Sequence, residues 1–126
     1  MKIVTRLLAA ALLAALPALA WAETALLMGE ETGCPWCARW HAEVGDAYAK
    51  TAEGRAAPLL RYDIHGALPE GVTLSKAVFF TPTFVLLRDG AEVARLEGYP
   101  GEDFFWGLLA RMLAGANVHV EDTQDD

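Results

Sequence analysis

The stretch "ETGCPWCARWHAE", residues Glu31–Glu43, holds the only two cysteines of the 126-residue chain, at the start of a helical pattern. Two residues, Pro35 and Trp36, separate Cys34 from Cys37. Proline is well placed in the first turn of a helix, where its missing N–H group would have no partner. Apolar residues then recur at the three- and four-residue spacings of an amphipathic helix: Trp36, Trp40, Val44, Ala47 and Tyr48. We therefore expect a helix that begins at Pro35 and fades between residues 51 and 54.

Two cysteines at this spacing can act as a redox pair. Cys34 lies at the predicted N-cap, where free N–H groups and the positive end of the helix dipole stabilise a thiolate. Such surroundings lower the pKa of a thiol from about 8.5 to roughly 3.5–7.5. We therefore expect Cys34 to be the nucleophile and Cys37, one turn inside the helix, to resolve a mixed disulfide formed at Cys34. Pro35 stiffens this loop, and Trp36 offers a substrate an aromatic surface beside the reactive sulfur.

Two other uses of the cysteines fit less well. A disulfide that closes so short a loop removes little entropy from the unfolded chain, so it makes a poor structural staple. The histidine spacing used by zinc sites is absent from the one candidate set, which is Cys34, Cys37, His41 and His65. We expect no metal and no cofactor, and we expect the histidines, His119 included, to be surface or packing residues. Copper handling by the two thiols stays open as an alternative.

The rest of the chain predicts a small α/β domain. Thr24–Gly29 and Leu59–Ile64 are short strands by composition, and the helix between them implies that they run parallel. Thr83–Arg88 and Ala91–Glu97, joined by a two-residue Asp-Gly turn, predict an antiparallel hairpin. Residues 65–80, which connect the two units, are punctuated by glycine and proline and predict at most one helical turn.

The closing element is the stretch "GEDFFWGLLARML", residues 101–113. It places a broad apolar stripe behind an acidic first turn, which predicts an amphipathic helix that covers a sheet. The fold class is therefore α/β, with a central mixed sheet of about four strands flanked by helices.

Thr81 and Pro82 stand immediately before the strand that begins at Thr83. Proline is unusual there, because it cannot donate to the hydrogen-bond ladder of a sheet. A cis bond would make a tight turn and leave the Thr81 backbone free to pair with an incoming peptide. A trans bond would make Pro82 an ordinary proline at a strand start, and the sequence leaves both conformations open.

The first residues predict a secretory signal peptide. Residues 1–22 carry Lys2 and Arg6 ahead of a short apolar run and end in Ala-Trp-Ala, which places cleavage after Ala22 or Ala20. The apolar run falls short of the roughly 20 residues that span a bilayer. We therefore expect a protein exported to the periplasm, where disulfides persist.

The mature chain is expected to be a soluble monomer of one domain, residues 23–116, followed by an acidic, disordered tail, residues 117–126. With Lys2 and Arg6 removed from the 10 basic residues and all 17 acidic residues kept, its charge is near −9. Such a charge argues against binding to nucleic acid and to anionic lipid.

These features together resemble the thioredoxin superfamily. A Cys-x-x-Cys pair that opens a helix after a first strand, a Thr-Pro before a strand, an Asp-Gly hairpin and a closing helix follow that pattern from about Leu26 to Leu113. Within the superfamily, three segments are most similar to the small periplasmic thioredoxins of bacterial sulfur-oxidation clusters, the SoxS type: "GCPWCARWHAE", "FTPTFVLLRDG" and "RLEGYPGEDFFWGLLARML".

The resemblance carries expectations about the site and the partners. The superfamily implies a cis Pro82 packed beside the Cys34–Cys37 pair, with a substrate peptide lying along Thr81. The SoxS type implies a reductase that keeps the carrier cysteine of a periplasmic sulfur-carrier complex free of unwanted disulfides. A membrane electron-transfer protein would recharge such a reductase.

One position departs from the thioredoxin pattern. Thioredoxins carry a buried acid six residues before the nucleophile, which helps to deprotonate the resolving cysteine, and here that position is Met28. Glu30 or Glu31 could substitute, although a solvated loop position is the simpler expectation for both. The proton acceptor for Cys37 therefore stays open.

Other functions fit the same residues. The rivals outside enzymes are a copper(I)-binding chaperone and a non-catalytic thioredoxin-like adaptor. The rival among enzymes is a Dsb-like thiol oxidase or isomerase, because a lower pKa at Cys34 would stabilise the reduced form and make the protein a stronger oxidant. The Pro-Trp dipeptide does not set the direction of electron flow, so the choice of a reductase rests on the resemblance.

Overall fold

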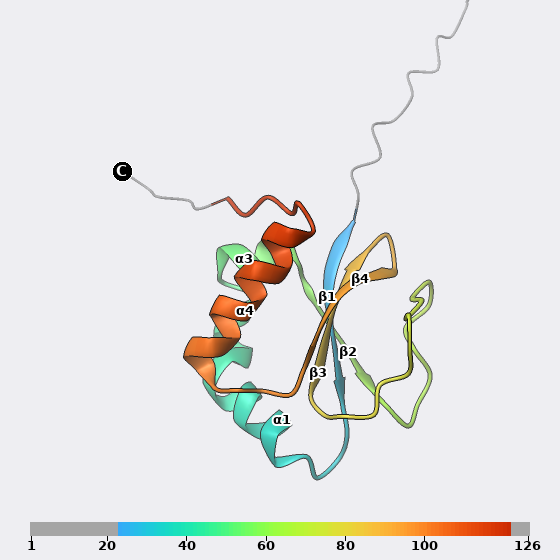
Figure 1. The fold of residues 1–126 in the computed structure, drawn as a ribbon. Helices are drawn as coiled ribbons and strands as arrows, with labels where there is room; N and C mark the ends of the chain where they lie inside the picture. The colour runs from blue at the N-terminus through green and yellow to red at the C-terminus, as the bar shows by residue number, and fades with distance from the viewer. Residues whose placement is uncertain (1–22, 122–126) are drawn as a thin grey trace, which may run out of the picture.

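A computed structural model describes residues 23–121 of the chain, in which a first strand and four short helical segments precede three strands and a longer closing helix (Figure 1). In chain order these elements are β1 (Thr24–Glu30), α1 (Pro35–Trp40), η1 (His41–Gly45), α2 (Asp46–Tyr48), α3 (Ala52–Ala56), β2 (Leu59–Asp63), β3 (Thr83–Arg88), β4 (Ala91–Glu97) and α4 (Glu102–Gly115). The predicted signal peptide, residues 1–22, and the end of the predicted tail, residues 122–126, lie outside the described residues. No helix between residues 23 and 121 is long and apolar enough to cross a membrane.

The strands form one mixed sheet in the order β2-β1-β3-β4. β1 and β2 are parallel, with Leu26 opposite Leu59 at one end and Glu30 opposite Asp63 at the other. β3 is antiparallel to both of its neighbours, β1 and β4. The predicted mixed sheet of about four strands flanked by helices is confirmed.

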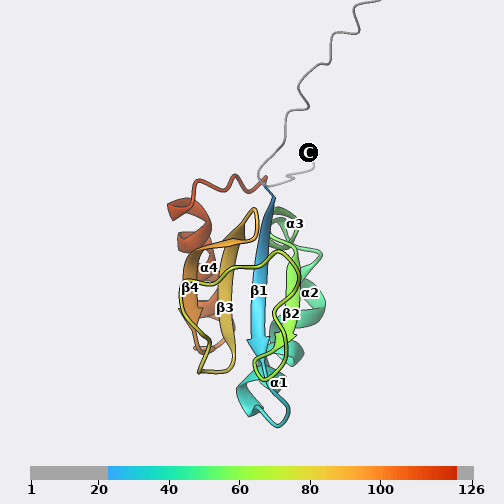
Figure 2. The same ribbon diagram turned by 90° about the vertical axis from the view of Figure 1, so that its right-hand side faces the viewer.

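The two faces of the sheet are covered differently. The helices lie against one face, and residues 64–82 cross the other without forming a helix (Figure 1 and Figure 2). The helix face holds the larger core, whose fully buried members include Leu26, Met28, Trp40, Tyr48, Phe84, Leu86, Phe105 and Leu109. The opposite face buries Leu27, Val85 and Leu87, with Val72 and Leu74 of the connection packed on them. Burial of one such aliphatic or aromatic side chain contributes about 1.5–3 kcal/mol, so the helix face supplies most of the stability.

The helical run after the cysteines ends at a tight turn. α1, η1 and α2 follow one another without a break, and a short second helix, α3, begins after Thr51. Thr51 caps α3 by accepting a hydrogen bond from the Gly54 N–H at its Oγ1, 3.0 Å away. A Cβ on Gly54 would lie 1.8 Å from the Tyr48 carbonyl oxygen, so this close approach requires glycine. The expected fading of the helix between residues 51 and 54 is therefore the start of α3.

The hairpin between β3 and β4 has the predicted Asp-Gly turn. Asp89 and Gly90 have φ angles of 50° and 81°, which is the left-handed geometry of a type I′ turn. Its return strand is irregular, because Leu87 pairs with Glu92 whereas Leu86 pairs with Ala94. Val93 is thus the extra residue of a β-bulge.

The chain after α4 continues along the core. The Val118 N–H donates to the Leu113 carbonyl at 2.9 Å, and Val118 and Val120 are partly buried against the larger core. The first residues of the predicted tail therefore pack on the domain.

Candidate active site

Cys34 and Cys37 form a disulfide at the start of α1, with their Cα atoms 5.3 Å apart. Cys34 is the N-cap of the helix, and its Sγ accepts a hydrogen bond from the Cys37 N–H at 3.1 Å. Cys37 is only 4% exposed, whereas Cys34 is half-buried. An incoming thiol or disulfide can therefore reach Cys34 more easily than Cys37.

The two residues between the cysteines lie on the surface. Pro35 is exposed at the first position of α1, and the Trp36 side chain is 52% exposed. The Arg39 guanidinium lies over the Trp36 ring, 5.6 Å from its centroid, and forms an ion pair with Glu43 at 2.7 Å. A cation thus covers one face of the indole, and the exposed part of the Trp36 side chain can contact a partner.

Thr81 and Pro82 lie beside the turn that carries the disulfide. The Thr81–Pro82 bond is cis, and Pro82 is buried. The Thr81 Oγ1 donates to the Glu31 Oε1 at 2.8 Å, and Glu31 also accepts the Cys34 N–H at its backbone carbonyl. Within residues 23–121 the Thr81 backbone N–H and C=O have no backbone partner. These two groups are available to an extended peptide.

Glu31 connects three segments at this point. Its Oε2 lies 2.8 Å from the His65 Nε2, while its Oε1 holds Thr81. The hydrogen bonds from Thr81 and His65 lower the pKa of Glu31 below the usual 4.5. Local sequence patterns do not reveal these contacts of Glu31, because His65 and Thr81 lie 34 and 50 positions away in the chain.

Glu30 and His41 also lie near the disulfide. Arg61 donates from Nε and Nη2 to the two oxygens of Glu30, both at 2.7 Å, and the His41 Nε2 lies 3.3 Å from the Glu30 Oε1. The hydrogen bonds from Arg61 lower the pKa of Glu30, and burial opposes them only in part. Glu30, His41 and Cys37 line one open cavity of about 410 Å³ beside the disulfide.

Met28 confirms the departure from the thioredoxin pattern. It is fully buried in the larger core, so no acid stands at that position. Glu30 follows two residues later on the same strand, which directs its side chain to the same face of the sheet. The acid on β1 therefore lies two residues closer to the disulfide, at Glu30, than the acid of the thioredoxin pattern, whose position is Met28 here.

No metal centre is evident in the described part of the chain, where no three His, Cys, Asp or Glu side chains are grouped as metal ligands. The four candidates Cys34, Cys37, His41 and His65 do not form such a set. His41 instead faces Glu30, and His65 faces Glu31.

Comparisons with known proteins agree with this geometry. No family model matches the chain, and no curated protein matches it. The crystal structure of the periplasmic thioredoxin SoxS from Paracoccus pantotrophus, in its reduced form, is 54% identical in sequence, with a TM-score of 0.73. The match covers 75% of this chain and 99% of that one. The X-ray structure of Fasciola hepatica thioredoxin is 23% identical, covers 71% of this chain and 81% of its own, and at a TM-score of 0.52 shows the fold alone. The chain belongs to the SoxS-like thioredoxins of the thioredoxin superfamily, and it is a thiol–disulfide oxidoreductase.

Proposed function

We propose that this protein reduces a disulfide on a partner protein in the periplasm through a Cys34–Cys37 dithiol/disulfide cycle. The observation that carries the proposal is the asymmetry of the pair, with an accessible Cys34 at a helix N-cap and a buried Cys37 one turn later. This is the arrangement that a nucleophile and a resolving thiol need.

The cycle has two exchange steps. The Cys34 thiolate attacks one sulfur of the partner's disulfide, so that a Cys34–partner bond forms and the other partner sulfur leaves as a thiolate. The Cys37 thiol then loses its proton and attacks Cys34, which closes the Cys34–Cys37 disulfide and releases the second partner thiolate. Two electrons have passed to the partner, and both of its thiolates take up protons.

The partner's peptide is proposed to lie against Pro35, Trp36, Thr81 and Pro82. The unpaired N–H and C=O groups of Thr81 support this placement, because they can add an extended segment by main-chain hydrogen bonds. Trp36 adds an exposed aromatic surface next to Cys34.

The relative supports the proposed compartment. The SoxS protein of Paracoccus pantotrophus is a periplasmic thioredoxin, which supports export by residues 1–22 to the periplasm, where the protein is proposed to work as a monomer. The proposed substrate is a disulfide on a sulfur-carrier protein, and the proposed electron donor is a membrane electron-transfer reductase. The negative charge of the chain disfavours nucleic acid as a partner.

The test is to trap the partner. The Cys37→Ser variant should accumulate mixed disulfides at Cys34 in the periplasm, because the resolving step is absent. The Cys34→Ser variant is the matched control and should trap nothing. The adducts are separated on non-reducing gels and identified by mass spectrometry. If Cys37→Ser gives no adduct that Cys34→Ser lacks, the exchange cycle is wrong.

A further inference from the structure

The connection that delivers Thr81 to the site has no regular structure of its own. Residues 64–82 form no helix, and within them only Thr73 joins the sheet, through a parallel bridge to Ala91. Ordering a segment of this kind costs roughly 1–2 kcal/mol per residue in backbone entropy, so its conformation needs external contacts.

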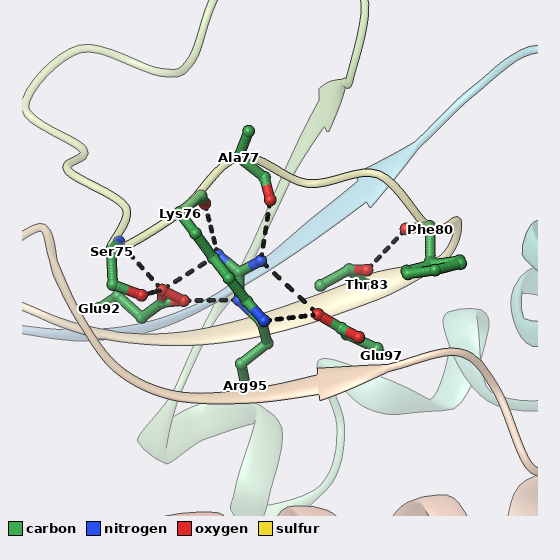
Figure 3. Close-up of polar contacts among 8 residues, drawn as sticks. All are labelled: Ser75, Lys76, Ala77, Phe80, Thr83, Glu92, Arg95 and Glu97. Carbon is green, nitrogen blue, oxygen red and sulfur yellow. Dashed lines mark hydrogen bonds and ion pairs between the residues drawn. The ribbon is translucent and has the colours of Figure 1, made fainter.

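Arg95 of β4 supplies two of these contacts directly (Figure 3). Its Nη2 donates to the Lys76 carbonyl at 2.7 Å, and its Nη1 donates to the Ala77 carbonyl at 3.2 Å. Its Nε and Nη2 also donate to the two carboxylate oxygens of Glu92, at 2.6 and 3.0 Å. One planar guanidinium thus holds two successive carbonyls of the connection and a carboxylate, a geometry that lysine cannot reproduce.

Glu92 completes the attachment. Its Oε2 accepts hydrogen bonds from both the backbone N–H and the hydroxyl of Ser75. The side chains of Glu92 and Arg95 are 7% and 10% exposed, so their ion pair is shielded from solvent. The Lys76 ammonium adds an ion pair to Glu97 at 3.2 Å. We call Arg95 and Glu92, with residues 75–77, the β4 anchor.

The bulge in β4 makes the anchor possible. In a regular strand, residues three apart point to opposite faces. The extra residue at Val93 turns Glu92 to the side of the sheet on which Arg95 lies. Ala94 and Leu96 meanwhile pack on the core of the helix face.

The anchor lies close to the proposed peptide-binding residue. Three residues separate Ala77 from Thr81, so the Cα atoms of these two residues are at most about 14 Å apart. Beyond Thr81 the chain is fixed again, because the Thr83 hydroxyl donates to the Phe80 carbonyl at 2.6 Å and the Gly98 N–H donates to the Pro82 carbonyl at 2.7 Å. Between these points Val78 is 8% exposed, so its side chain adds apolar burial to the polar contacts, whereas Phe79 and Phe80 are 78% and 64% exposed and add little.

We propose that Arg95, acting through the β4 anchor, is a positioning residue that sets the Thr81 backbone in the geometry that accepts the partner's peptide. This inference rests on the proposed function of Thr81 as a peptide-binding residue. Arg95 touches neither cysteine in this arrangement, so the chemistry of Cys34 and Cys37 is independent of it.

The experiment compares a protein substrate with a small thiol. Full-length mature protein is prepared as wild type, Arg95→Met and Arg95→Lys, with Arg111→Met, an exposed arginine of α4, as the matched control. Reduction of insulin disulfides measures exchange with a polypeptide. Reduction of the Cys34–Cys37 disulfide by dithiothreitol measures exchange with a thiol that needs no contact at Thr81.

The expected result is a selective loss. Arg95→Met should raise the KM for insulin about tenfold, because small displacements of a binding group cost large factors, and it should leave the dithiothreitol rate within about twofold of wild type. Arg95→Lys should recover only part of the loss, and Arg111→Met should change neither rate. Equal insulin kinetics in wild type and Arg95→Met would overturn the inference, and so would a parallel fall of both rates.

One substitute variant and the behaviour of wild type complete the test. If Arg95→Met does not fold, as judged by circular dichroism, Glu92→Gln replaces it, because this variant removes the ion pair and keeps the shape. Equal insulin kinetics in a folded Glu92→Gln protein would then overturn the inference. Failure of the proposed function looks different, since wild type itself would then react with dithiothreitol but fail to reduce insulin.

Discussion

The two halves of the site are held in place by different forces. The disulfide turn sits on α1, whose Trp40 packs in the aromatic core at centroid distances of 5.3 Å from Phe84 and 5.7 Å from Phe105. The proposed peptide-binding half sits at the end of residues 64–82, which bury Val78, cover a much smaller apolar cluster and depend on the β4 anchor and on Glu31. The reactive sulfurs are thus fixed by apolar packing, and the proposed peptide contact is fixed mainly by polar contacts.

This difference predicts a separation of effects. Apolar burial is worth several kcal/mol per large side chain, whereas a single net hydrogen bond contributes about 0.5–1.5 kcal/mol. Changes in the helix half should therefore lower the stability of the whole domain. Changes in the connection should mainly lower exchange with proteins.

The largest effect is expected at Trp40. Trp40→Ala should lower the free energy of unfolding by about 3–5 kcal/mol, because it empties a fully buried aromatic position between α1, β3 and α4. Trp36→Ala is the matched control, since Trp36 is 52% exposed, and it should cost less than about 0.5 kcal/mol. Urea unfolding followed by circular dichroism measures both. Equal losses in the two variants would show that apolar packing does not distinguish the two positions.

A smaller effect is expected at the bridge between the halves. Thr81→Val removes the hydroxyl that donates to Glu31, and Glu31→Ala removes the acceptor. Each should raise the KM for a disulfide peptide by about two- to threefold, the effect of one modest hydrogen bond. The double variant should be no worse than the more impaired single variant, because both remove the same contact. Effects that multiply in the double variant would mean that the two residues act separately.

The smallest effect near neutral pH is expected from the three carboxylates that fasten these segments. The folded protein lowers the pKa of Glu30, Glu31 and Glu92 below 4.5. At Glu92 burial favours the neutral acid, but the hydrogen bonds from Arg95 and Ser75 outweigh it. The folded state thus binds these protons more weakly than the unfolded state. Their stabilisation is complete above the unfolded pKa and is lost as the pH falls through the folded values.

Unfolding in urea should therefore show stability that decreases below about pH 4.5. Glu92→Gln should lessen this dependence, because one of the three lowered groups is gone. If the stability of Glu92→Gln falls with pH as steeply as that of wild type, the lowered pKa of Glu92 does not contribute to this pH dependence.

The parts of the fold that follow local rules could be predicted from the sequence. The Asp-Gly turn predicted the hairpin. The helix between the first two strands, Thr24–Gly29 and Leu59–Ile64, predicted that these strands pair in parallel. The cysteine site could be predicted from the Cys-x-x-Cys pair at a helix start, because both thiols lie within one turn. Thr81 could be named as a candidate from its place before the strand, whereas its cis bond to Pro82 followed only from the resemblance to the thioredoxin superfamily.

The rest depends on contacts between distant residues. Glu31 meets Thr81 and His65, and Glu30 meets Arg61, across separations that no local pattern reveals. The β4 anchor depends on a bulge, which places Glu92 and Arg95 on one face although an alternating strand would separate them. These contacts depend on the register of the strands in the sheet, which local sequence patterns do not determine.

We propose that the Cys34–Cys37 pair works as a reductant of protein disulfides. The most direct measurement is its midpoint potential, obtained by equilibrating the protein with dithiothreitol or glutathione redox buffers and quantifying the free thiols by alkylation. For a reductant we expect a midpoint potential of about −270 mV, as in thioredoxin. A value near about −120 mV, as in the strong oxidant DsbA, would contradict it.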